Sequence, residues 1–111
     1  MKTENKNLSQ SVSSLPADLQ KYGFWNELKA LSFVKAIYLF GSRARGDCRA
    51  KSDIDIAIDC TGATECQWQI LLYIIENADT LLGIDVVRYD TLDNSSFKQK
   101  INKDRVVVYE K

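Results

Sequence analysis

The sequence predicts an α/β domain in which helices pack on a mixed, mainly four-stranded sheet. Three observations predict it: short apolar runs of strand length, one run that alternates strictly with aspartates, and a long amphipathic segment between two of these runs. With 111 residues, the chain is one domain that is large enough for a single hydrophobic core.

The N-terminal half divides into a tail, a helix, a strand and a turn. Residues 1–14 carry few apolar groups, so we expect a disordered tail there and an ordered domain over residues 15–111. Apolar spacing predicts a helix over residues 24–31. Residues 36–40 (AIYLF) are apolar on both faces, as expected of a central strand, and a short helix can begin over residues 42–45.

The alternating run comes next. Ile54, Ile56 and Ile58 alternate with Asp53, Asp55, Ala57 and Asp59, which predicts a strand with one buried and one polar face. Asp53 and Asp55 therefore project from the same side of this strand.

The C-terminal half predicts a helix, a strand, a short helix and a final strand. Thr64 and Gln67 form a plausible capping box for a helix over residues 64–82, with Gly83 as its stop. Its apolar stripe is assigned to the core and comprises Trp68, Leu71, Leu72 and Ile75. Residues 83–87 read as a strand, Asn94 or Ser95 can cap a helix with Phe97 and Ile101 inward, and residues 106–109 read as the last strand.

Three acids form the candidate catalytic and metal site. Two carboxylates on one strand face repel each other and have raised pKa values unless a cation lies between them. Mg²⁺ prefers such oxygen ligands, and Mn²⁺ accepts them too. If the strand over residues 83–87 lies beside the first, Asp85 completes with Asp53 and Asp55 a triad able to hold two ions. Asp59, Asp90 and Asp93 are interpreted as solvated or turn residues.

The turn after residues 36–40 supplies the candidate nucleotide-binding groups. Gly41 has no side chain to block a phosphate from the backbone, and Ser42 offers a hydroxyl donor at the start of a short helix. Arg43 or Arg45 could neutralise phosphate charge. The residues alone do not decide which arginine points inward.

Composition excludes several classes of function. Fifteen basic and fifteen acidic residues cancel, which counts against a polymerase that grips a long template and gives no sign of membrane binding. The chain has no histidine and no CxxC pair, so Ser-His, Cys-His and His-metal sites are excluded. A polar N-terminus and the lack of a membrane-length apolar run lead us to expect a cytoplasmic protein.

Residues 41–58 (GSRARGDCRAKSDIDIAI) resemble the active-site signature of the polymerase-beta-like nucleotidyltransferases. The element order over residues 22–111 resembles the minimal nucleotidyltransferase domain, in the branch often encoded beside a HEPN-domain protein. The resemblance implies that Gly41 and Ser42 contact a nucleoside triphosphate. It also implies that Asp53 and Asp55 bind metal and phosphate, and that Asp85 activates the acceptor hydroxyl.

The expected function is metal-dependent transfer of a nucleoside monophosphate from a triphosphate, with ATP as the expected donor, to a hydroxyl. The resemblance implies an antitoxin whose acceptor is a hydroxyl, such as a tyrosine, on a helical HEPN-type partner. Larger relatives, such as the aminoglycoside nucleotidyltransferases, continue into a helical domain that completes the substrate cleft. Two alternatives stay open: a non-catalytic module that binds nucleotide or partner and occludes a toxin, and an enzyme acting on a small-molecule hydroxyl. The oligomeric state, homomeric or heteromeric, is left open.

Overall fold

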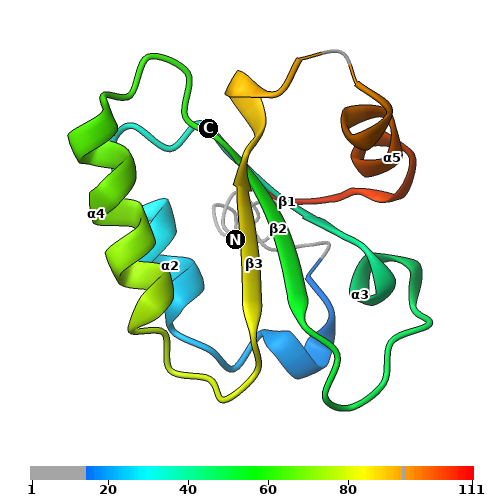
Figure 1. Cartoon of the computed structure of the whole chain (residues 1–111). Helices are drawn as coiled ribbons and strands as arrows, with labels where there is room; N and C mark the ends of the chain where they lie inside the picture. Colours follow the sequence, from blue (N-terminus) through cyan, green and yellow to red (C-terminus); the bar gives the residue numbers. More distant parts are fainter. Residues whose placement is uncertain (1–14, 94) are drawn as a thin grey trace, which may run out of the picture.

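Four strands form one mixed sheet with helices on both faces in the computed structural model, which describes residues 15–93 and 95–111 (Figure 1). The fold class predicted from the sequence is confirmed. The tail expected over residues 1–14 lies outside the described residues. The strands are β1 (Ala36–Phe40), β2 (Ile54–Asp59), β3 (Ile84–Arg88) and β4 (Val106–Glu110). The helices are η2 (Ala17–Leu19), α2 (Phe24–Lys29), α3 (Ser42–Arg45), α4 (Glu65–Glu76), η3 (Tyr89–Thr91) and α5 (Ser96–Asp104).

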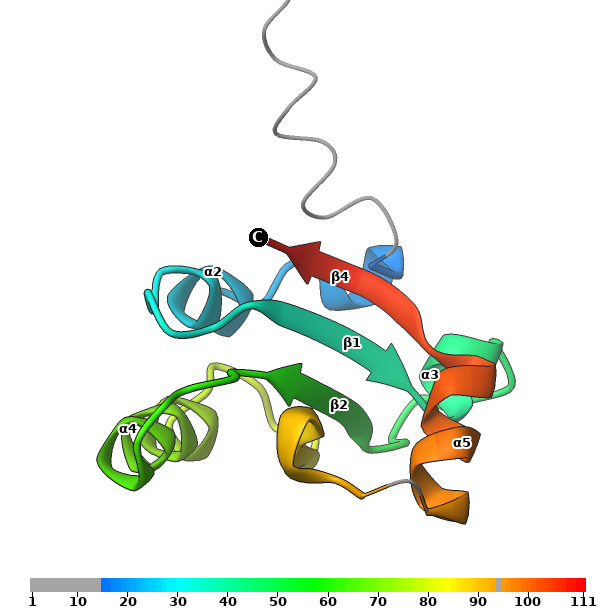
Figure 2. The ribbon, with the colours of Figure 1, turned by 90° about the horizontal axis from the view of Figure 1, so that it is seen from above.

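The strand order is β3-β2-β1-β4. β1 is antiparallel to both β2 and β4, whereas β2 and β3 are parallel and are connected through α4. α2 and α4 lie together on one side of the sheet, and α5 lies on the other (Figure 2). Because β1 runs opposite to β2 and β3, the end of β1 and the beginnings of β2 and β3 lie at the same end of the sheet.

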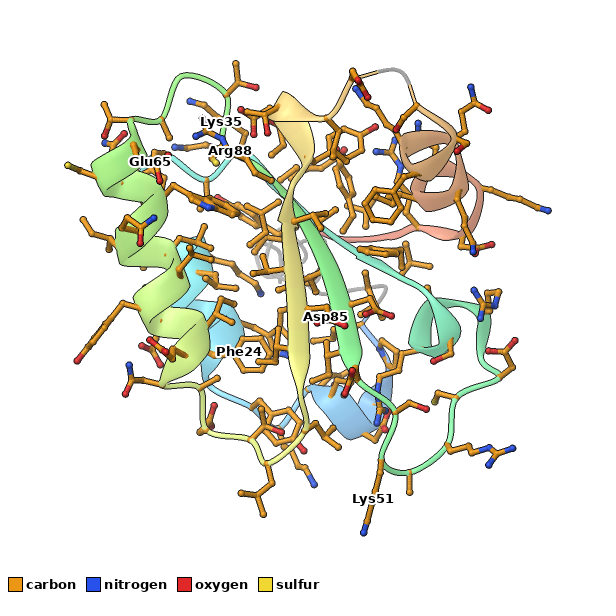
Figure 3. All side chains as sticks on the ribbon, in the orientation of Figure 1. Phe24, Lys35, Lys51, Glu65, Asp85 and Arg88 are labelled. Carbon is orange, nitrogen blue, oxygen red and sulfur yellow. The ribbon has the colours of Figure 1, made fainter. Side chains whose placement is uncertain are left out.

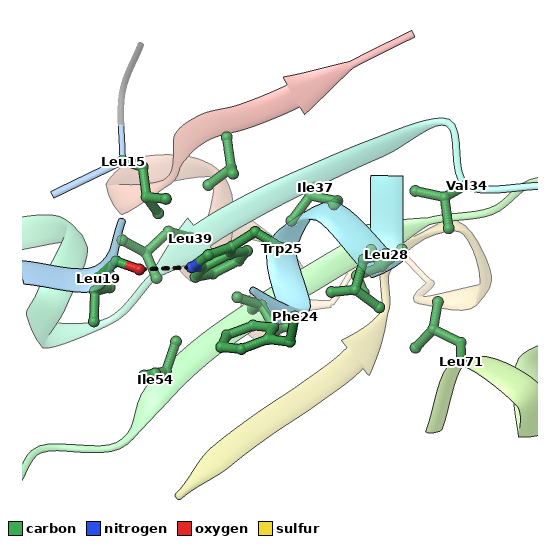
Figure 4. Close-up of a cluster of buried hydrophobic side chains, with 13 residues drawn as sticks. Leu15, Leu19, Phe24, Trp25, Leu28, Val34, Ile37, Leu39, Ile54 and Leu71 are labelled. Atoms are coloured by element: carbon green, nitrogen blue, oxygen red, sulfur yellow. Dashed lines mark hydrogen bonds between the residues drawn. The ribbon is translucent and has the colours of Figure 1, made fainter. Parts of the chain in front are cut away.

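The main core fills the space between the sheet and α2 (Figure 4). All three isoleucines of β2 are fully buried there, as the alternating pattern predicted, together with Phe24 and Leu28 of α2 and Leu71 of α4. The indole N–H of Trp25 donates a hydrogen bond of 2.9 Å to the Leu19 carbonyl, which joins η2 to this core. Burial of large apolar side chains at this density supplies most of the driving force for folding.

The opposite face of the sheet is less polar than the sequence pattern indicated. Ile101 of α5 packs on Ala36, Tyr38 and Ala57 in a second buried cluster. Ala57, expected on the polar face, is therefore fully buried. The polar part of this face is confined to the ends of β2, where Asp55 lies half-buried.

α4 is shorter than predicted. The capping box of Thr64 and Gln67 is confirmed, but the helix ends at Glu76 instead of Leu82. Asn77 caps the end of the helix, and its side-chain amide donates a hydrogen bond of 2.9 Å to the Tyr73 carbonyl. Beyond it, the Asp79 carboxylate accepts the Gly23 N–H at 2.8 Å and the Phe24 N–H at 3.2 Å, at the start of α2. The Gly23 N–H in particular holds the pKa of Asp79 below its ordinary value.

α5 is capped by Ser95, whose hydroxyl accepts the Lys98 N–H at 3.3 Å. Ile101 is buried as predicted, whereas the inward position predicted for Phe97 is wrong, because that side chain is 42 % exposed. Across residues 15–93 and 95–111, the helices are all too short or too polar to span a bilayer.

Candidate active site

The three predicted acids lie on one face of the sheet, near the start of β2 and β3. Asp53 immediately precedes β2, and Asp55 is directly opposite Asp85 in the parallel pairing of β2 with β3. The expectation that the Asp85 strand lies beside the Asp55 strand is confirmed. Figure 3 shows Asp85 where β2 and β3 run side by side, whereas Arg88 lies at the far end of β3, near the start of α4.

Asp55 occupies the most enclosed position of the three. Its residue is half-buried, while Asp53 and Asp85 are exposed. Burial raises the pKa of Asp55 to about 6, and the negative charges of Asp85 and Asp53 act in the same direction. Arg45 opposes this increase in pKa. A carboxyl group with this pKa lacks enough positive charge around it to stabilise its ionised form.

Gly41 allows the enclosure of Asp55. Its backbone has φ 74° and ψ −158°, a region occupied almost only by glycine. A Cβ atom at Gly41 would overlap the Asp55 carboxylate and lie 3.1 Å from its Cγ. The group that closely approaches Gly41 is therefore the Asp55 carboxylate.

Gly83 accommodates Asp53 in a similar way. A Cβ atom there would lie 2.6 Å from Oδ1 and 3.2 Å from Cγ of Asp53. Because Gly83 precedes β3 and Gly41 follows β1, Asp53 and Asp55 lean toward different neighbours of β2.

The donor chemistry of this site fits a hard divalent cation. Three carboxylates share one face, and Asp55, the most enclosed of them, also meets the negative charges of Asp85 and Asp53. Within the part of the chain that the structure describes, no three His, Cys, Asp or Glu side chains stand close enough to hold a metal as placed. Metal binding by all three acids therefore requires their side chains to change position.

Arg43 holds the loop that precedes β2. Its guanidinium is buried and donates to the carbonyls of Ser52 at 3.0 Å and Ala50 at 3.2 Å. It also pairs with Asp18 of η2 at 3.0 Å. These contacts show that Arg43 positions the loop that leads to Asp53. Of the two arginines that could neutralise phosphate charge, Arg45 is therefore the candidate.

Arg45 lines the site and connects α3 with α5. Its side chain is 42 % exposed and forms ion pairs of 3.1 Å with Asp47 and with Asp104 of α5. Its position beside Asp55 suits a contact with phosphate, although a phosphate would compete with both carboxylates.

A pocket of about 350 Å³ opens beside Asp55, between the turn after β1 and α5. Gly41, Ser42, Arg45 and Asp55, all of them predicted site residues, line it, whereas Arg43 does not. Its remaining lining comes from Phe40 at the end of β1 and from Phe97, Lys100, Ile101 and Asp104 of α5. A larger open groove of about 570 Å³ lies between α4 and the start of β3, and it contains none of the predicted site residues.

The family model described as Polymerase beta, Nucleotidyltransferase matches residues 25–111. The chain belongs to this family. It is a nucleotidyltransferase, and the acids predicted to be catalytic lie within the matched segment.

Known proteins agree with this assignment. A protein of Methanocaldococcus jannaschii named "Putative protein adenylyltransferase" is 34% identical over 77 residues, which cover 68% of this chain and 77% of the relative. The crystal structure of a "putative nucleotidyltransferase" from Sulfolobus solfataricus has a TM-score of 0.54 at 25% identity and covers 100% of this chain and 93% of that chain.

Two toxin–antitoxin structures share the fold. One, determined with AMP-PNP, has a TM-score of 0.56 at 20% identity and covers 79% of this chain and 72% of that chain. The other is a mutant of the MntA-HpeT toxin–antitoxin, with a TM-score of 0.59 at 18% identity, covering 78% of this chain and 71% of that chain.

The contribution of α5 to the pocket of this nucleotidyltransferase was not predicted from the sequence. Phe97 fits an inward apolar position of a helix, and Lys100 reads as an ordinary surface residue. No local pattern distinguishes them. They reach the site only because Ile101 packs on Ala57 and Asp104 pairs with Arg45.

Proposed function

We propose that this nucleotidyltransferase transfers the nucleoside monophosphate of ATP to a hydroxyl group on a partner protein. The observation that carries the proposal is the placement of Asp53, Asp55 and Asp85 on one sheet face beside a pocket. The relative named as a protein adenylyltransferase supports ATP and a protein acceptor. The neighbouring structure with AMP-PNP supports an adenine nucleotide.

Asp53, Asp55 and Asp85 are the residues that would hold Mg²⁺ or Mn²⁺. Two such ions, when bound, neutralise the triphosphate and stabilise the attacking and leaving oxygens of an in-line displacement. The mutant neighbour carries replacements of two aspartates that have the same spacing as Asp53 and Asp55.

The remaining steps are assigned to this chain's own groups. Asp85, which is exposed, accepts the proton of the acceptor hydroxyl, whose oxygen then bonds to the α-phosphorus while pyrophosphate leaves. Gly41 and Ser42 contact the triphosphate, and Arg45 offsets its negative charge. The transfer needs no histidine, because positioning and electrostatic stabilisation supply most of the catalysis in phosphoryl transfer.

The proposed partner is a helical HEPN-type protein that this chain counteracts as an antitoxin. The open position of the acids supports an acceptor that belongs to another molecule: Asp53 and Asp85 are exposed at the end of the sheet. The toxin–antitoxin neighbours support the pairing. A tyrosine hydroxyl is the proposed acceptor, as the resemblance to the HEPN-associated branch implies.

Incubation of the chain with Mg²⁺, ATP labelled at the α-phosphate and the HEPN-domain protein tests this proposal. Label on the partner, located by mass spectrometry, is the expected result, and Asp53→Asn should abolish it. Asp59→Asn is the matched control, since Asp59 lies on the same strand face but caps the following turn through the Thr61 N–H and hydroxyl.

The alternative functions give different results. If the partner binds and is inhibited equally by the wild type and Asp53→Asn, without label, the chain is a binding module and the transfer proposal is wrong. If label reaches only a small-molecule hydroxyl supplied in the assay, the reaction class stands and the protein acceptor is wrong.

A further inference from the structure

Phe97 is the unusual residue of the pocket beside Asp55. Phe97 is 42 % exposed, although Ile101 of the same helix is fully buried. Part of the apolar ring of Phe97 is therefore open to the solvent. Its ring meets Phe40 edge-on, with centroids 6.1 Å apart and planes at 78°. The contact fixes the ring of Phe97 while keeping it open to the pocket.

The position of this aromatic pair relates it to the acids. Phe40 is the last residue of β1, directly before Gly41, and it pairs with Asp55 across β1 and β2. A flat ring stacked on Phe97 would therefore lie near the Gly41-Ser42 turn, which is proposed to contact the triphosphate. The pocket volume of about 350 Å³ suits a nucleoside, with the phosphates extending toward the open acids.

We propose that Phe97, supported by Phe40, is the platform on which the purine base of the nucleotide stacks. This inference deepens the proposed function and rests on it. Every base has a π-face that stacks on an aromatic side chain, and the larger purine ring system covers more of the platform.

The same lining predicts which bases the enzyme distinguishes. The described residues that line the pocket include no asparagine or glutamine, the side chains that pair bidentately with an adenine edge. Lys100 lines the pocket and only donates hydrogen bonds. It can donate to a ring nitrogen of either purine or to the exocyclic oxygen of guanine, so it does not distinguish the two bases. ATP and GTP should bind within a few-fold of each other, and both more tightly than CTP.

Binding of ATP, GTP, CTP and inorganic triphosphate to the full chain, measured by calorimetry, tests the platform. Phe97→Ala should weaken ATP and GTP about fivefold or more, the lower end of the effect of removing one aromatic stacking partner. Inorganic triphosphate, which has no base, should bind the variant and the wild type equally. Phe97→Trp should restore the affinity for ATP.

Tyr73→Ala is the matched control, because Tyr73 is also an exposed aromatic residue, 67 % exposed on α4, and it does not line the pocket. Its nucleotide affinities should equal those of the wild type. In transfer assays, Phe97→Ala should raise KM for ATP with little change in kcat, since the base takes no part in the chemical step.

The outcomes distinguish this inference from the proposed function. If the wild type binds inorganic triphosphate as tightly as ATP, or if Phe97→Ala weakens both equally, the platform is wrong even when transfer occurs. If ATP binding depends on Phe97 but no acceptor is ever labelled, the platform stands and the proposed transfer is wrong.

Discussion

Asp55→Asn should stabilise the metal-free protein while it abolishes nucleotide transfer. In the folded chain the Asp55 carboxylate is half-buried and faces the negative charges of Asp85 and Asp53. Asparagine has nearly the same shape and no charge. The substitution therefore removes the repulsion while preserving the packing against Gly41.

The magnitude follows from the pKa of Asp55. An increase from 3.8 to about 6 corresponds to at most about 3 kcal/mol of destabilisation by the ionised group. Because the side chain is partly exposed and screened by solvent, we expect about 1 kcal/mol. For a domain of this size, that raises Tm by about 5 °C.

The pH dependence provides a stringent test. The pKa of Asp55 is higher in the folded than in the unfolded chain, so the ionised group lowers stability above pH 6. This loss disappears as the pH falls from about 6 to below 3.8, where the group is protonated in both states. Thermal unfolding in EDTA should show the Tm gain of Asp55→Asn at pH 8 and little gain at pH 4.

Asp59→Asn is the control for this experiment. Its carboxylate accepts hydrogen bonds from Thr61 at the other end of β2, so its replacement should not raise Tm. A gain for Asp55→Asn that persists at pH 4, or no gain at pH 8, would contradict the repulsion argument. Mg²⁺ should also raise the Tm of the wild type more than that of Asp55→Asn, because bound cation relieves the same repulsion.

Three further substitutions test the supports of the site. Gly41→Ala should cost about 1–3 kcal/mol of stability in thermal unfolding and displace Asp55, so that transfer falls with it; unchanged transfer would show that the turn adapts. Arg43→Gln should cost about 2 kcal/mol in urea unfolding, because the buried guanidinium and its hydrogen bonds to two loop carbonyls are lost; an unchanged midpoint would place Arg43 outside the structural network. Trp68→Ala should cost about 2 kcal/mol of unfolding free energy, because Trp68 is only partly buried and a fully buried ring would cost roughly 3–5 kcal/mol. A loss of about 5 kcal/mol would contradict the partial burial of Trp68.

The elements that could be predicted from the sequence are those whose signal is local. The strict alternation over residues 53–59 specifies a strand and its buried isoleucines, because a one-residue slip would turn every side chain to the wrong face. The capping box of Thr64 and Gln67 likewise depends on residues three positions apart. The three acids were identified for the same reason, as two lie on one strand and the third on another short apolar run.

The features that could not be predicted depend on residues far apart in the chain. The path of the chain after α4 depends on Asp79, which binds the start of α2 more than fifty positions earlier, although Asn77 at the C-cap is a local signal for the end of the helix. The different roles of Arg43 and Arg45 depend on the path of the loop over residues 46–53 and on the position of Asp104. Both arginines are equivalent in the sequence pattern.

The two faces of the sheet separate stability from catalysis. On the face covered by α2 and α4, every β2 position is a fully buried isoleucine, and this face supplies the main core. On the other face, the small Ala57 lets α5 approach closely through Ile101, while Asp55, two residues earlier, stays only half-buried. The anchored end of α5 thereby positions Phe97 and Lys100 beside the acids without covering them. Because Ala57 packs with Ile101, we expect a larger residue at position 57 to displace α5, which forms one wall of the candidate nucleotide site.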